Sequence, residues 1–321
     1  MIIGVMGPEG SYSEKAAKLW TAKYDLCGAE FRYFADIEDT LLAAVQGKSD
    51  LSVIPVENSI EGSVGITLDL LLEKDVRMVG EVVVKIEHCL LAKGRLEEIR
   101  IILSHPQGLA QCRHFLKKHF PGTELRSTGS TSHAARLAGE FEEMAAIASP
   151  EAAECYKLKT LLSNIQDQKE NYTRFIVLKA GEKNPKAGET DQVWQAPFSA
   201  EATMELTSCP ESEYDPGIMQ ENLISTCKNF PFKTSLIIYL EKDRPGALYE
   251  ILGAFAKRKI NLTKIESRPS KKELGDYYFY IDFDGHTSDA LIKDALKDII
   301  IKVDTLKVLG SYPACKSEQK Y

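Results

Sequence analysis

The 321-residue sequence predicts an α/β domain followed by a small ferredoxin-like α+β domain. Residues 1–180 alternate short apolar runs with helical patterns, which is typical of a mostly parallel sheet flanked by helices. From Lys233 onward the order becomes strand, helix, strand, strand, helix, strand, the βαββαβ order of a ferredoxin-like unit. Residues 181–232 are rich in Pro, Glu, Ser, Lys and Gly with few periodic apolar residues, which predicts a linker or inserted loop. We therefore expect domains at 1–180 and 233–313, that linker between them, and a C-terminal tail at 314–321.

The first domain is expected to have two lobes. A long β-type run crosses its middle at 76–84, and a second crossing near 158–172 leads back to a strand like the first ones, which predicts a cleft between lobes. Asp36, Ser63 and Ser130 stand where helix N-caps belong. The predicted strands are 1–6, 29–34, 50–54, 99–104, 144–149 and 173–179, and the predicted helices are 13–24, 36–46, 63–73, 106–119, 131–140 and 150–157.

The second domain carries an aromatic strand at 276–284 that alternates only partly between apolar and polar residues. Both of its faces are therefore expected to be covered, and a second copy of the chain is one way to cover a face or extend an edge. The predicted strands are Thr234–Leu240, Ile260–Glu266, Asp276–Asp284 and Val303–Ser311, and the predicted helices are Ala247–Arg258 and Asp289–Asp298.

Composition excludes several classes of protein. A formal charge of −7 and a pI near 5.6 argue against a nucleic-acid partner, which requires a basic surface. The N-terminus is typical of a buried strand rather than a signal peptide, and no apolar run approaches the roughly 18 residues of a membrane span. The seven cysteines are widely spaced and form no C-x-x-C pair, which favours reduced, mostly buried thiols in the cytoplasm. No metal and no cofactor are expected.

Polar motifs follow the predicted strands at the ends where open α/β sheets bind ligands. A purely structural interpretation makes Ser13 and Ser63 helix caps and His105 a turn residue. The alternative is that hydroxyls, amides and Arg174 bind a ligand. The planar guanidinium group of Arg174 suits a carboxylate. The chemistry of these residues predicts a small anionic ligand bound between the lobes. It does not predict which reaction is catalysed. The motifs are Gly7–Ser13, Pro55–Val64, Ser104–Cys112, Ser130–Ala135 and Asn171–Phe175.

Together these motifs resemble the prephenate dehydratase family across nearly the whole chain. The matching stretches are G-P-E-G-S-Y-S at 7–13, P-V-E-N-S at 55–59, S-H-P-Q at 104–107, S-T at 130–131 and N-Y-T-R-F at 171–175. The C-terminal unit is similar to a phenylalanine-sensing ACT domain through 233–236, 245–248 and 261–269.

The resemblance implies a periplasmic-binding-protein type II-like catalytic domain that converts prephenate to phenylpyruvate, water and carbon dioxide. With no chorismate mutase segment ahead of Met1, the enzyme is expected to be monofunctional. Arogenate dehydratase and a non-catalytic amino-acid sensor are the alternatives. Gly108 and Ser132 depart from the family's usual residues, and the 181–232 segment is longer than expected.

The resemblance also assigns roles to residues. It leaves open whether Thr173 or a buried, protonated Glu57 serves the departing hydroxyl. The implied catalytic set is Thr173, Glu57, Asn58, Ser104 and Gln111. The implied substrate-binding set is Ser11, Tyr12, Ser59, Gln107, Ser130, Thr131, Arg174 and Phe175. The implied phenylalanine site, formed between ACT domains of a homodimer or homotetramer, is Gly246, Ala247, Leu248, Asn261, Leu262, Glu266, Ser267, Arg268 and Pro269.

Overall fold

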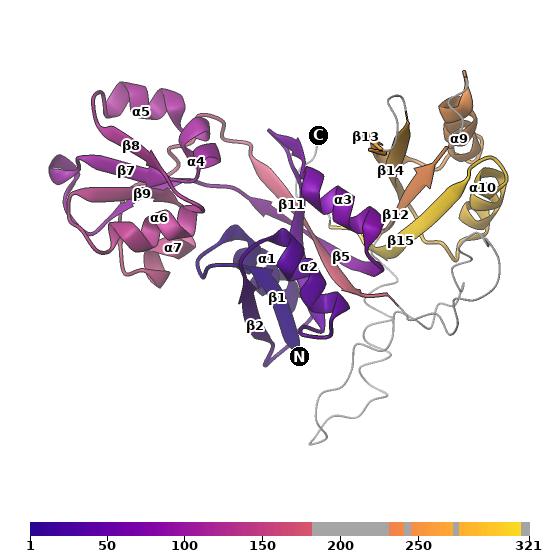
Figure 1. Cartoon of the computed structure of the whole chain (residues 1–321), viewed down its shortest axis with the longest axis horizontal. Helices are drawn as coiled ribbons and strands as arrows, with labels where there is room; N and C mark the ends of the chain where they lie inside the picture. The colour runs from indigo at the N-terminus through magenta and orange to yellow at the C-terminus, as the bar shows by residue number, and fades with distance from the viewer. Residues whose placement is uncertain (182–230, 241–244, 272–275, 316–321) are drawn as a thin grey trace. The chain divides into compact units, whose positions relative to one another are not determined.

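The computed structural model describes residues 1–181, 231–240, 245–271 and 276–315 (Figure 1). Most of the predicted linker at 181–232, and the predicted tail from 316 onward, lie outside the described residues. The chain divides into two compact units. The first comprises Met1–Leu70 and Val82–Val177, and the second comprises Leu71–Glu81 and Leu178–Tyr321. The domain boundaries given by the sequence remain a prediction.

The first sheet has the strand order β2-β1-β3-β11-β5, with the short β4 paired to β3. Strand β1 runs parallel to both β2 and β3, as predicted. Strands β5 and β11 each continue along the chain from one compact unit into the other. The strands are β1 (Ile2–Met6), β2 (Glu30–Phe34), β3 (Leu51–Asn58), β4 (Gly62–Ser63), β5 (Val76–Lys85) and β11 (Tyr172–Ala180), and the helices between them are α1 (Tyr12–Lys23), α2 (Ile37–Val45) and α3 (Gly65–Glu73).

The second sheet has the order β10-β6-β9-β7-β8 and is mixed. Strand β7 is parallel to β8 and β9, while β6 is antiparallel to β9 and β10. Helices α4 and α5 lie on one face and α6 and α7 on the other (Figure 1). The strands are β6 (Cys89–Ala92), β7 (Ile101–Ser104), β8 (Glu124–Ser127), β9 (Met144–Ala148) and β10 (Lys159–Leu162), and the helices are η1 (Leu96–Glu98), α4 (Pro106–Gln111), α5 (Arg113–His119), α6 (Thr131–Ala138) and α7 (Pro150–Cys155). Two sheets in one compact unit confirm the two predicted lobes.

The single helix predicted at 106–119 is wrong, because it divides at Cys112 into α4 and α5. The physical reason lies in a remote carboxylate. Asp167 accepts hydrogen bonds from the backbone N–H groups of His114 (2.9 Å) and Phe115 (3.1 Å), which begin the second helix. A side chain 52 and 53 residues away in sequence thus takes the place of a local cap, and no local sequence pattern predicts it.

The predicted helix caps are partly confirmed. Asp36 and Ser130 accept from the backbone N–H groups that their positions predict. Ser13 does not cap α1; the cap is Ser11, whose hydroxyl accepts from the N–H of Glu14. The cap predicted at Ser63 is wrong, because that residue belongs to β4 and α3 begins only at Gly65.

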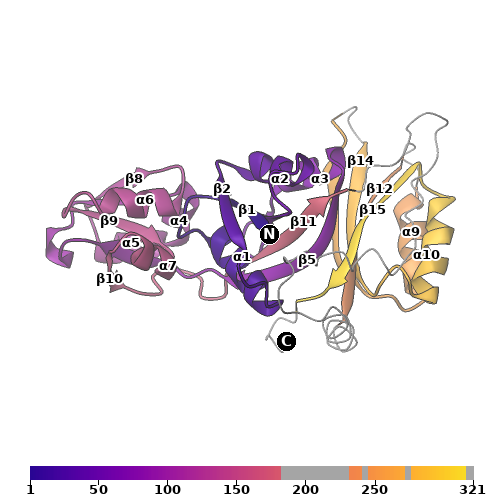
Figure 2. The same ribbon diagram turned by 90° about the horizontal axis from the view of Figure 1, so that it is seen from below.

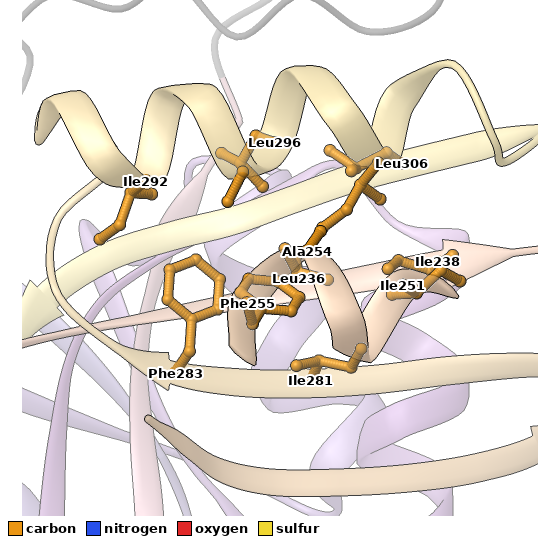
Figure 3. Close-up of a cluster of buried hydrophobic side chains, with 12 residues drawn as sticks. Leu236, Ile238, Ile251, Ala254, Phe255, Ile281, Phe283, Ile292, Leu296 and Leu306 are labelled. Carbon is orange, nitrogen blue, oxygen red and sulfur yellow. The ribbon is translucent and has the colours of Figure 1, made fainter. Parts of the chain in front are cut away.

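The C-terminal domain confirms the predicted βαββαβ order. Its antiparallel sheet has the order β13-β14-β12-β15, and helices α9 and α10 cover one face (Figure 2). Phe255 of α9 and Phe283 of β14 meet in the core, with ring centroids 5.0 Å apart (Figure 3). The elements are β12 (Phe232–Tyr239), α9 (Ala247–Ala256), β13 (Leu262–Pro269), β14 (Tyr277–Asp284), α10 (Ala290–Ile300) and β15 (Thr305–Pro313).

The segment Leu71–Glu81 belongs to the same compact unit as this domain. The ammonium group of Lys307 on β15 donates to the backbone carbonyls of Leu71, Leu72 and Lys74, at and just beyond the C-terminal end of α3. These include carbonyls left without intrahelical partners, so a half-buried lysine stabilises the helix end. The pKa of Lys307 is lowered by this burial.

No helix among the described residues is long and apolar enough to cross a membrane. The described cysteines are free thiols, and two of them, Cys89 and Cys112, are buried. The expectation that most thiols are buried is wrong for Cys27 and Cys155, which are exposed. Burial raises the pKa of Cys112 to about 12, so that thiol stays protonated.

Candidate active site

The site is built where β3 ends and β11 begins, two neighbouring strands of the first sheet. Asn58 is the last residue of β3, and Thr173 is the second residue of β11. Asn58 is 7% exposed, and its Nδ2 donates to the hydroxyl oxygen of Thr173 at 2.9 Å. Thr173 donates to no other described residue, so its hydrogen remains available to a ligand. The structure therefore brings together two of the five predicted catalytic residues in one hydrogen bond.

The side chain of Asn58 is oriented by hydrogen bonds from the turn that follows it. Its Oδ1 accepts from the backbone N–H groups of Ile60 (3.0 Å) and Glu61 (3.1 Å). Its Nδ2 also donates to Oδ1 of Asn171 at 2.8 Å, and Asn171 is fully buried. The amide thus has partners on both ends, which orients it for Thr173.

Gln111, at the end of α4, brings the second lobe into this network. Its Oε1 accepts from Nδ2 of Asn171 at 3.0 Å and lies 2.8 Å from Nε2 of His88. Its Nε2 donates to Oε1 of Glu61 at 3.1 Å. Residues from both lobes therefore share one set of hydrogen bonds, and the catalytic role of Gln111 stays a prediction.

Ser59 sets the register of the two strands at the site. Its hydroxyl accepts from the backbone N–H of Tyr172 at 2.9 Å, and its own N–H donates to the carbonyl of Tyr172 at 2.8 Å. These two bonds hold the turn after β3 against the start of β11. Ser59 thereby positions Thr173, which is a role separate from any contact of Ser59 with a ligand.

Glu57 and Arg174 form a charged pair beside the network. An oxygen of Glu57 lies 3.8 Å from a guanidinium nitrogen of Arg174, and the two side chains are 38% and 13% exposed. The buried position expected for Glu57 as the rival donor is therefore not observed. Arg174, in contrast, is shielded enough for its interaction with an anion to be strong.

Ser104 lies apart from the network. It is fully buried at the end of β7, and its hydroxyl donates to the carbonyl of Ile147 at 2.7 Å. A Cβ on Gly108 would collide with this hydroxyl and pack at 3.5 Å against the methyl group of Thr131. Ser104 thus joins β7 to β9 and packs against α4, and Gly108 gives it the room to do so.

The remaining predicted substrate residues lie at helix starts and strand ends. Ser11 and Ser130 cap α1 and α6, and Thr131 is the first residue of α6. The N–H of Gln107 donates to the ring Nδ1 of His105, 3.3 Å away, which makes His105 a helix cap. Phe175 is 2% exposed and packs in the core. None of these residues has a described hydrogen bond to the network around Thr173.

Tyr12 contacts the network only through the ring of His88 among the residues that the structure describes. Its ring meets the imidazole edge to face at 6.2 Å, and its hydroxyl donates to the carbonyl of Glu87. Burial, with the charge of Glu151 second, raises the pKa of Tyr12 well above its usual value. Tyr12 is therefore a neutral hydrogen-bond donor.

The predicted effector residues lie at the start of α9 and along β13. Gly246 caps α9 with φ of 88°, a left-handed conformation that favours glycine, and no atom lies within 4 Å of where its Cβ would be. Strand β13 is an edge of the sheet, and its residues alternate between exposed and half-buried. At its start, Nδ2 of Asn261 donates to Asp284 at 2.8 Å.

Sequence reasoning missed three residues of the network: Asn171, His88 and Glu61. Asn171 and Glu61 stood inside motifs that were noticed, so their polar side chains were a signal. His88 follows β5 in the crossing to the second sheet, and nothing in its spacing marks it. Its contact with Gln111 spans 23 residues of sequence.

Comparison with known proteins gives two family matches. A model described as prephenate dehydratase matches residues 3–183, and a model described as ACT domain matches residues 234–301. A prephenate dehydratase of Methanocaldococcus jannaschii is 38% identical over 95% of this chain and 96% of its own length. The chloroplastic arogenate dehydratase/prephenate dehydratase 2 of Arabidopsis thaliana is 35% identical over 97% of this chain and 72% of its own length.

Among solved structures, the chain is similar to a prephenate dehydratase from Arthrobacter aurescens in complex with L-Phe. The TM-score is 0.75 at 29% sequence identity, and the match covers 99% of this chain and 93% of that one. The similarity therefore extends over both compact units.

Proposed function

Because the chain belongs to the prephenate dehydratase family, we propose that the network around Thr173 is where prephenate loses water and carbon dioxide. The enzyme is a prephenate dehydratase with an ACT domain and is regulated by L-phenylalanine. The observation that carries the site proposal is the 2.9 Å hydrogen bond from Asn58 to Thr173.

The reaction requires little covalent chemistry from the protein. The ring carboxylate leaves as carbon dioxide, and the electron pair of the broken carbon–carbon bond moves through the ring and expels the ring hydroxyl. That hydroxyl takes up one proton and leaves as water, and the ring becomes aromatic. The site must therefore supply a hydrogen-bond donor at the departing oxygen and hold the carboxylates in place.

Thr173 is the donor in this proposal. Asn58 Nδ2 occupies one lone pair of the hydroxyl oxygen, so the hydroxyl hydrogen points elsewhere. A threonine hydroxyl is a poor acid, and its contribution is a preorganised hydrogen bond to charge that develops in the transition state, or the relay of a proton. The orientation of Asn58 by backbone N–H groups supports this role.

Glu57 is the rival donor, and its surroundings disfavour that role. That role was expected for a buried Glu57, whereas the side chain is 38% exposed and lies 3.8 Å from Arg174. We place Glu57 beside the substrate as the partner that orients Arg174. Arg174 then binds a substrate carboxylate with its planar fork.

We propose different roles for the other predicted residues. Gln111 faces the site through its Nε2, which already donates to Glu61 and can be shared with a substrate oxygen. Ser11, Tyr12, Ser59, Gln107, Ser130 and Thr131 are proposed to line the bound substrate. Ser104 and Phe175 are buried, so we propose that they support the site without contacting the substrate.

The regulatory proposal places phenylalanine at the start of α9, against β13 of a second copy. Open space at Gly246 admits a ligand close to the backbone, and the outer position of β13 among the described strands suits pairing with a partner. The residues proposed for this site are Gly246, Ala247, Leu248, Asn261, Leu262, Glu266, Ser267, Arg268 and Pro269. The proposal requires at least a homodimer, and we also propose a homodimer or homotetramer that acts in the cytoplasm.

An assay that measures the formation of phenylpyruvate by its ultraviolet absorbance tests the catalytic proposal. We expect turnover of prephenate that L-phenylalanine slows. Arogenate is run in parallel, because the Arabidopsis relative carries both substrates in its name. Faster turnover of arogenate would reassign the substrate, and turnover of neither would reject the proposed activity.

A further inference from the structure

His88 lies beside the network without a part in the chemistry described above. It sits between β5 and β6, is 3% exposed, and its backbone is held on both sides. Its N–H donates to Oε1 of Gln166 at 3.0 Å, and its carbonyl accepts from Ile165 at 2.9 Å. With Tyr12 against one edge of the ring, the imidazole has a defined place.

The donor and acceptor of each hydrogen bond in the network can be deduced by starting from Asn58, whose orientation is fixed by backbone groups. Backbone N–H groups only donate, so the atom of Asn58 that faces Ile60 and Glu61 must be the oxygen. Its nitrogen therefore donates to Asn171 and Thr173. Asn171 accepts with its oxygen, and its nitrogen must donate onward.

The next acceptor is Oε1 of Gln111, 3.0 Å from the nitrogen of Asn171. The same oxygen lies 2.8 Å from Nε2 of His88, so Nε2 must carry a hydrogen. Nδ1 of His88 is buried and has no hydrogen-bond partner among the described residues. A proton there would be a buried donor without an acceptor, and burial accordingly lowers the pKa of His88.

We infer that His88 is a positioning residue for the dehydration: its neutral, Nε2-protonated ring holds the Gln111 amide with Oε1 inward and Nε2 toward the substrate. A flipped Gln111 would put its NH₂ group against two other donors. The inference rests on the proposed function, since it assumes that Gln111 and Thr173 serve the same substrate. Gln111, Asn171 and Asn58 connect His88 to the hydroxyl of Thr173 through the same chain of bonds.

A purely structural role for His88 makes a different prediction. If the ring only filled space, leucine would replace it well, and would even remove the partnerless Nδ1. If its N–H orients Gln111, glutamine is the better substitute, because its amide nitrogen reaches about as far as Nε2. The pair His88→Leu and His88→Gln therefore separates packing from hydrogen bonding.

The kinetic experiment compares these variants with an exposed histidine, His119, which stacks on Phe115. We expect His88→Leu to lower kcat by about tenfold with little change in KM, because one oriented hydrogen bond is lost. His88→Gln should recover most of that loss, and His119→Leu should show none. Equal loss in both His88 variants, or no loss in His88→Leu, would overturn the inference.

Two further measurements do not depend on how well the variants turn over. In the Gln111→Met background, His88→Leu should cost nothing more, because the acceptor is gone; an additive loss would count against the inference. In the unaltered enzyme, nitrogen NMR of labelled histidine should show the Nε2–H tautomer of His88 at neutral pH. The Nδ1–H tautomer would overturn the inference even in an active enzyme, and the NMR result decides it if the enzyme does not turn over prephenate.

Discussion

The ammonium group of Lys233 lies 2.9 and 3.0 Å from the two carboxylate oxygens of Glu81, whose side chain is 1% exposed. The backbone N–H of Cys315 donates to the same carboxylate at 2.8 Å. Lys233 belongs to the first strand of the ACT domain, and Glu81 belongs to β5, which continues toward His88. This pair therefore joins the first strand of the ACT domain to β5, the strand that precedes His88 of the proposed site.

Removing one partner of this pair should destabilise the protein. We expect Lys233→Met to lower the free energy of unfolding by about 3 kcal/mol, because the buried Glu81 loses its salt bridge to Lys233. Chemical denaturation measures the change. The control is Lys297→Met, which breaks an exposed 3.4 Å pair with Asp294 and should cost less than about 0.5 kcal/mol. Equal effects in the two variants would show that burial of the Glu81 pair does not matter.

Thr173→Val tests the assignment of the hydrogen-bond donor. The variant keeps the shape of the side chain and removes the hydroxyl that Asn58 orients. We expect kcat to fall by about 100-fold or more with a modest change in KM, because a transition-state hydrogen bond is lost. Thr173→Ser should retain measurable activity. Steady-state kinetics on prephenate decides, and near-normal turnover in Thr173→Val with an inactive Glu57→Gln would move the role to Glu57.

Local sequence pattern was sufficient for much of the fold. Parallel β1, β2 and β3 and the βαββαβ domain follow from alternating apolar runs, since period and length separate strands from helices. The sequence analysis missed four short strands, β4, β6, β8 and β10, because runs of two to four residues rarely show a clear period.

The candidate site was predicted to the extent that its residues stand in motifs. Asn58, Gln111 and Thr173 stand in such motifs and share one hydrogen-bond network, while their catalytic roles stay predictions. Their connection depends on contacts between distant segments, such as Asn171 with Gln111, 60 residues apart. Such contacts leave no trace in local spacing, so His88 could be found only from the folded chain.

Two glycines should respond to alanine in opposite directions. A Cβ on Gly108 would collide with the hydroxyl of Ser104 and disturb its bond to Ile147, so Gly108→Ala should lower the free energy of unfolding by about 1 kcal/mol. Gly253 lies inside α9 with no atom within 4 Å of its Cβ position, so Gly253→Ala should raise it by about 0.5–1 kcal/mol. Denaturation of both variants tests this, and equal destabilisation would contradict it.

The regulatory half is best tested by a point substitution. Deleting residues 233–321 would remove the partner of Glu81 and the lysine that covers the end of α3, so lost activity in the truncated protein would be ambiguous. Gly246 offers a cleaner test, because its φ of 88° and the open space around it confine the effect to the turn.

We expect Gly246→Ala to weaken L-phenylalanine binding by about tenfold. A left-handed residue with a Cβ costs roughly 1–2 kcal/mol, and the added methyl group projects into the space proposed for the ligand. Calorimetry measures the affinity, and inhibition of prephenate turnover should weaken in parallel, because binding and regulation are linked reciprocally. Gly253→Ala, in the same helix, is the matched control and should bind phenylalanine normally. If Gly246→Ala binds phenylalanine as tightly as the unaltered enzyme while inhibition persists, the effector site lies elsewhere.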